Sequence, residues 1–144
     1  MIARETIYAG LFTIVSGSAG FVTKSRKLQH VQDVPAVNQP ALFQIQGHQS
    51  ADATFNLPTK WRLKVDLYVY AHASNPGADG NGATLLNTLV DAIVTALEPD
   101  KASGRQTLGG LVSHCAIDGD VETDEGLLGE QAIAVLPIVI IPYP

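Results

Sequence analysis

Trp61-Arg-Leu-Lys-Val-Asp-Leu-Tyr-Val-Tyr70 alternates apolar and polar side chains along ten residues. Because successive side chains of a β-strand point to opposite faces, this period of two predicts a strand with one buried face. Burying one Val or Leu side chain is worth about 1.5 to 3 kcal/mol, so we expect this strand at the centre of the core. Its other face carries charge and tyrosine, which indicates solvent or a partner protein. The residues expected on the buried face are Trp61, Leu63, Val65, Leu67 and Val69.

The composition is that of one folded domain. With 144 residues, 46% hydrophobic and 16% charged, the chain can bury a core, and we treat residues 1–144 as a single domain. No apolar run reaches the roughly 18 to 20 residues that span a bilayer, because the longest, Ala132 to Ile141, is short and contains Pro137. This predicts no membrane partner. The single cysteine, Cys115, excludes an intrachain disulfide framework and fits a reducing compartment.

Apolar spacing on both sides of this strand predicts an α+β fold, in which an antiparallel-rich mixed sheet packs against two main helices. Apolar residues recur at helical spacing from Ala3 to Ser16 and from Ala83 to Leu97, where Pro99 follows. A signal peptide is the alternative for residues 1–20, and Glu5 favours a mature helix. The other expected strands are Phe21 to Leu28, Ala41 to Gly47, Leu111 to Ile117 and Glu130 to Ile141, with His48 to Thr59 as a hairpin turn.

Seven residues are expected in the core because they lie on the apolar faces of these elements. They are Leu11, Leu63, Val65, Leu67, Leu86, Leu89 and Ile93.

Five carboxylates crowd one short stretch, and hard cations such as calcium favour clustered carboxylates. They are Asp118, Asp120, Glu122, Asp124 and Glu125. An EF-hand loop starting at Asp118 would need glycine at its sixth position and glutamate at its twelfth, where this chain has Thr123 and Gly129. A solvated connection between two strands is therefore favoured over a metal site.

No other motif indicates catalysis or a cofactor. His114 and Cys115 are neighbours on an expected strand, so their side chains point to opposite faces and cannot form a nucleophile pair; a buried cysteine is favoured. The segment from Gly77 to Gly82 precedes a helix but lacks the P-loop pattern GxxxxGK[ST]. The sequence predicts no catalytic, cofactor-binding or metal-binding residue.

Charge is segregated along the chain. Basic residues exceed acidic ones through Lys64, with Lys24, Arg26 and Lys27 close together, whereas six acids and no Lys or Arg follow Gln106. Two surfaces of opposite charge can join copies of one protein head to tail. We therefore expect the basic cluster of one subunit to face the acidic residues 118–125 of the next. Merely solvated charge is the alternative; nucleic-acid binding is weaker, because the net charge is −5 and no aromatic residue is interleaved with the basic cluster.

Six short motifs are spread over nearly the whole chain: Phe21-Val-Thr-Lys-Ser-Arg26, Asp33-Val-Pro35, Gln39-Pro-Ala-Leu-Phe43, Lys60-Trp61, Gln106-Thr-Leu-Gly-Gly110 and Asp124-Glu-Gly126. Together they resemble the tail terminator, or minor tail, proteins of tailed bacteriophages. The resemblance implies a small α+β virion subunit that forms a ring, usually of six copies, at the head-proximal end of the tail tube. The ring stops tube polymerisation and meets the head's connector, and the family has no catalytic residues.

This resemblance implies three partners: other copies of the chain, the tail tube protein and the head connector. DNA would pass through the lumen without specific binding, and the protein would assemble in the host cytoplasm before joining the virion. Two alternatives stay open, another neck or head-completion adaptor, and a small hydrolase or ligand-binding domain. The acidic residues could also line the lumen, where negative charge would keep DNA from sticking.

Overall fold

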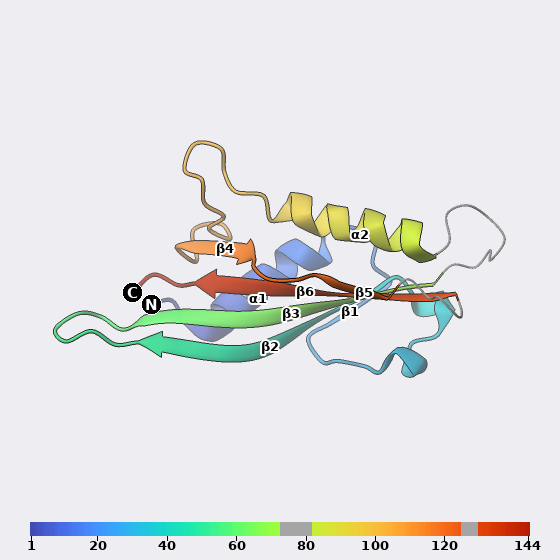
Figure 1. Ribbon diagram of the computed structural model, residues 1–144, viewed down its shortest axis with the longest axis horizontal. Coiled ribbons are helices and arrows are strands. Elements are labelled where there is room, and N and C mark those ends of the chain that lie inside the picture. Colours follow the sequence, from blue (N-terminus) through green and yellow to red (C-terminus); the bar gives the residue numbers. More distant parts are fainter. Residues whose placement is uncertain (73–81, 125–129) are drawn as a thin grey trace.

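The computed structural model describes residues 1–72, 82–124 and 130–144, which form an α+β domain (Figure 1). Two helices, α1 (Arg4–Ser16) and α2 (Gly82–Ala96), cover one face of a sheet. The strands are β1 (Thr23–Ser25), β2 (Ala41–Asp52), β3 (Lys60–His72), β4 (His114–Ile117), β5 (Glu122–Asp124) and β6 (Gln131–Ile141), and two 3-10 turns, Val31–Asp33 and Ala36–Asn38, lie between β1 and β2.

The described residues form one mixed, mostly antiparallel sheet with β3 and β6 in the middle. Its order is β1-β2-β3-β6-β4, and β5 also pairs with β6. Only β1 and β2 run parallel; the other pairs are antiparallel. This confirms the predicted fold class.

The main core lies between the helices and one face of the sheet. Opposed residues of β3 and β6, such as Leu67 with Leu136 and Val65 with Ile138, are buried beneath Leu11 of α1 and Ile93 of α2. All seven predicted core residues are buried, which confirms the helical and strand faces read from the sequence. Trp61 is only half-buried, because it lies near the end of β3 beside the Arg4 side chain, 4.4 Å from the ring centre.

The other face of the sheet holds a smaller core that the alternation of β3 did not predict. Tyr70 was expected on an open face, yet it is buried against Phe43, with ring centroids 5.2 Å apart. The connector between β1 and β2 covers this end of the face: Val34 packs there, and Tyr70 donates a hydrogen bond to the carbonyl of Gln29. The expectation of an open face was wrong at this end.

The turn expected from His48 to Thr59 was also wrong in length. β2 continues to Asp52, so the connection to β3 contains only residues 53–59. A register shift between Gln46 and Gln49 absorbs Gly47 and His48 and keeps the two strands paired up to Asp52 and Lys60. The paired residues 50–52 and 60–62 and their connection form a hairpin, hereafter the arm, whose tip extends beyond the helices (Figure 1).

Proline 137 explains why the outer strand next to β6 is broken. Asp118 donates its backbone N–H to the carbonyl of Pro137, but proline has no N–H to return. The register then shifts from Ile117 opposite Ile138 to Glu122 opposite Val135. The left-handed Gly119 lies here, where an added Cβ would approach the Pro137 ring to 3.2 Å. The expected strand from Leu111 to Ile117 is therefore short, and the expected acidic turn contains β5.

Replacing Leu89 with alanine should lower the free energy of unfolding by about 2 to 5 kcal/mol, because the side chain is buried in the main core. Urea denaturation measures this, with exposed Asn87→Ala on the same helix as the control. A loss below about 0.5 kcal/mol for Leu89→Ala would contradict the packing of α2.

Candidate interaction surfaces

The two charged clusters lie on opposite sides of the sheet. Lys24 belongs to β1, the outer strand on one side, and Arg26 and Lys27 follow it. Asp118, Asp120, Glu122 and Asp124 lie in or between β4 and β5, which border β6 on the other side. Glu125 lies outside the described residues. The folded chain thus separates the opposite charges across the width of the sheet, as a head-to-tail contact requires.

Arg26 already has a partner within its own subunit. Its guanidinium forms a bidentate pair with Glu5 of α1, with Nη2 3.2 Å from Oε2, and lies 6.0 Å from the Tyr8 ring. The hydrogen bond from Arg26 holds the pKa of the Glu5 carboxyl below its ordinary value. This pair fastens the chain after β1 to α1. The cations of the basic cluster that have exposed side chains are Lys24 and Lys27.

On the acidic side of the sheet, too, one residue has a partner within its own subunit and others are exposed. Oδ2 of Asp118 lies 3.7 Å from Nζ of Lys64 on β3, so this ion pair crosses β6. Asp120 and Glu122 are exposed and border a shallow hollow of about 450 Å³ on the face opposite the helices. Its other lining residues are Asp66, Tyr68, Gly119, Val135 and Pro137. The acidic residues available to a partner are therefore centred on Asp120 and Glu122.

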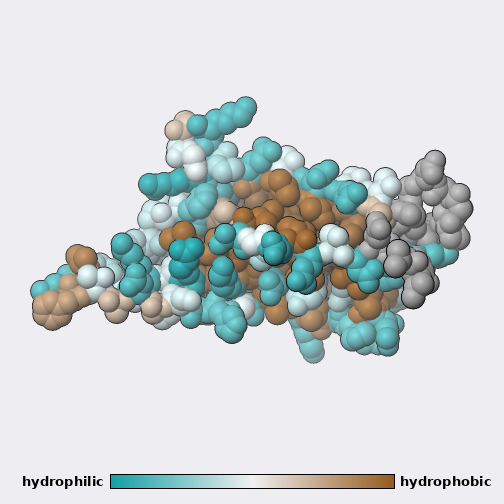
Figure 2. Space-filling view, in the orientation of Figure 1, coloured by the Kyte–Doolittle hydropathy of each residue, from teal (hydrophilic) through white to brown (hydrophobic). Residues whose placement is uncertain are grey.

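The arm carries the most exposed large apolar side chain of the described chain. Phe55 is 91% exposed and Leu57 is 60% exposed, and both lie in the connection between β2 and β3. Figure 2 shows hydrophobic surface at the free end of the arm. Sequence analysis missed this feature because the segment was read as a polar turn; the pair of apolar residues within it was the available signal. Such a tip is typical of a segment that binds another protein.

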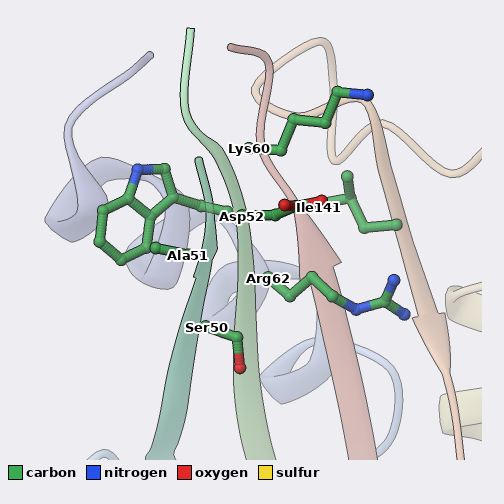
Figure 3. A pocket seen from close by; sticks show the side chains of 7 residues that line it. Ser50, Ala51, Asp52, Lys60, Arg62 and Ile141 are labelled. Carbon is green, nitrogen blue, oxygen red and sulfur yellow. The ribbon is translucent and has the colours of Figure 1, made fainter. Parts of the chain in front are cut away.

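Two small apolar hollows lie near the ends of the strands. One, of about 170 Å³, sits at the base of the arm, where Asp52, Lys60, Arg62 and Ile141 contribute to its wall (Figure 3). The other, of about 210 Å³, lies between the end of α2 and β4. It is lined by Val94, Leu97, Glu98, Pro99, Ala116 and Ile117. Figure 2 shows apolar surface gathered between α2 and the sheet.

The described residues contain no group of three or more His, Cys, Asp and Glu side chains that could hold a metal ion. Cys115 is buried, as predicted, and burial raises the pKa of its thiol to about 12. His114 instead accepts a hydrogen bond at Nδ1 from the backbone of Gln106, which fastens the loop before β4. Within residues 1–72, 82–124 and 130–144, no helix is long and apolar enough to cross a membrane.

Comparison with known proteins yields a structural likeness only. No family model and no curated protein matches the chain. Among solved structures, one chain whose name states no function is 13% identical, with a TM-score of 0.48, and the match covers 100% of this chain and 99% of that one. A likeness at this level carries no argument about function.

The Cys115 thiol should resist modification in the folded protein. Thiolate is the reactive form, and a pKa near 12 leaves very little of it at pH 8, so labelling by iodoacetamide should be at least about a hundredfold slower than in urea. Mass spectrometry follows the labelling. Equal rates in the folded and unfolded protein would contradict the burial of this side chain.

Proposed function

We propose that this chain is a structural virion subunit, the tail terminator of a tailed bacteriophage. Copies of it form a ring of six at the head-proximal end of the tail tube, stop tube polymerisation and present a surface to the head's connector. The proposal starts from the resemblance carried by the six short sequence motifs, and it assigns the chain no catalytic role. It places the protein in the phage neck after assembly in the host cytoplasm.

The observation that best supports this proposal is the position of the charges. Any ring of more than two copies needs two different, complementary surfaces on each copy. Here Lys24 lies in the outer strand β1 and Lys27 follows it, whereas Glu122 lies in β5 and Asp120 precedes it on the opposite side of the sheet. Opposite charges on opposite edges of a sheet steer copies into head-to-tail contact and disfavour contact between like edges.

The ring meets two further partners, the tail tube protein and the head connector, and DNA crosses its lumen without specific binding. Exposed ion pairs contribute only about 0 to 1 kcal/mol each, so the charges set direction and register while apolar contacts supply most of the affinity. Acidic residues that face the lumen instead of a neighbour would repel the DNA backbone. Charge reversal separates these two placements.

The purified chain should form a ring that light scattering after size exclusion measures. Lys24→Glu with Lys27→Glu should weaken assembly, because the two exposed cations would then repel the acidic edge of the next copy. Adding Asp120→Lys and Glu122→Lys should restore part of it. Lys101→Glu with Arg105→Glu, which changes exposed cations of another loop, is the matched control.

Two results would count against this arrangement. A chain that remains monomeric at all concentrations would contradict ring formation. Assembly that tolerates both reversals, together with slower DNA passage in infected cells, would place the acidic residues in the lumen. Cryo-electron microscopy of the neck then distinguishes the end of the tail from another adaptor position.

A further inference from the structure

Among residues 1–72, 82–124 and 130–144, nothing covers the tip of the arm. Phe55 is 91% exposed, and the strands that carry it run away from the hollow between α2 and β4 (Figure 1). The strand pairing of Ala51 with Trp61 and Asp52 with Lys60 holds this direction, so the tip can reach such a hollow only in another molecule. Because these strands are already paired in the free subunit, the arm loses little conformational entropy on binding.

We propose that Phe55 at the arm tip of one copy inserts into the hollow between α2 and β4 of the next copy. The inference rests on the proposed ring and names the apolar contact that closes it. Val94, Leu97 and Ile117 would surround the phenyl ring. A cavity of about 150 Å³ is large enough to bind benzene, so a hollow of about 210 Å³ has room for this side chain.

Charge around the two surfaces is complementary. Lys60 and Arg62 are exposed on the strand that leads from the tip, and Glu98 lines the hollow. Asp91 lies on the exposed side of the same helix, one turn before Val94. The contact thus joins an aromatic anchor to an apolar hollow and sets cations against carboxylates at its rim.

The alternative binding site for the tip is the hollow at the base of another copy's arm. That hollow is lined by Lys60 and Arg62 as well as Asp52, so two arms placed together would bring like charges into contact (Figure 3). Exchange of two arms is also symmetric and would stop at a dimer. The hollow beside β4 avoids both problems.

Position in the sheet agrees with this choice. The arm continues β2 on the side of the sheet that carries β1 and the basic cluster, and the hollow adjoins β4 on the acidic side. Along the strands the tip lies at the end of β2 opposite to the residues that pair with β1, so the arm contact and the contact between the charged clusters are two separate points between neighbouring copies. The same two contacts repeat from copy to copy.

Replacing Phe55 with serine tests the anchor. Loss of one buried aromatic side chain should raise the concentration at half-assembly by about tenfold to a hundredfold, measured by light scattering. Val94→Asp, which places a charge in the hollow, should do the same from the other side. Val37→Ser is the matched control, since Val37 is 81% exposed but lies outside the arm and should leave assembly unchanged.

A crosslink identifies the partner surface. Thr54→Cys and Glu98→Cys in one chain should give a ladder of covalent oligomers on oxidation, and a mixture of the two single variants should stop at dimers. Thr54→Cys with Asn87→Cys, on the same helix but outside the hollow, should not crosslink. Cys115 is buried, so it should not form a crosslink.

The outcomes separate this inference from the function on which it rests. If the Phe55→Ser variant forms rings as well as the wild type does, and Thr54→Cys with Glu98→Cys gives no crosslink, the arm contact is overturned. The tail terminator proposal would then still stand. A wild-type chain that never assembles would overturn the ring itself. Assembly that stops at wild-type dimers, with a crosslink between Thr54→Cys and Ser50→Cys, would assign the tip to the base of a second arm instead.

Discussion

The two longest strands, β2 and β3, are about twice as long as the helix α1 that covers them, and much of the protein's surface follows from that mismatch. β3 has 13 residues and rises about 3.3 Å per residue, so it extends about 43 Å. α1, also of 13 residues, rises 1.5 Å per residue and covers about 20 Å. Two helices laid on one face cannot cover such strands to their ends. Among the described residues, 50–52 of β2 and 60–62 of β3 pair only with each other, and with their connection they form the arm.

The edges of the sheet depend on a second local constraint, the missing N–H of Pro137. Without it the strand beside β6 cannot continue, so β4 and β5 stay short and the chain between them bulges outward with Asp118 and Asp120. A short, charged and irregular edge does not invite indiscriminate strand pairing. This edge is therefore suited to a specific partner that reads side chains, and the proposed neighbour in the ring does so.

The sequence predicts this fold well wherever one periodicity dominates. The alternation in Trp61 to Tyr70 and the helical spacing around Leu89 identify the buried faces, because burial of one face leaves a repeating pattern. Prediction from the sequence fails where the burial of a side chain depends on a distant part of the chain or on a very short segment. Tyr70 is buried by a connector from far earlier in the chain, so its burial leaves no local pattern. Phe55 and Leu57 are a pair of apolar residues in a short connection that also contains Asn56 and Pro58, and a single pair is too short to show a periodicity. The charges were found in the sequence, but their own partners, Glu5 for Arg26 and Lys64 for Asp118, required the folded structure.

The energies involved explain why a ring would need several modest contacts together. One buried aromatic side chain contributes about 1.5 to 3 kcal/mol and one exposed ion pair at most about 1 kcal/mol, so a single contact corresponds to weak binding of two copies. In a ring, the last copy meets neighbours through its arm and its hollow at the same time. The second contact then forms at a high effective concentration, which favours closure over open chains. A subunit that met its neighbours in this proposed way would stay free when dilute and would close cooperatively once enough copies gathered at the end of a tail tube.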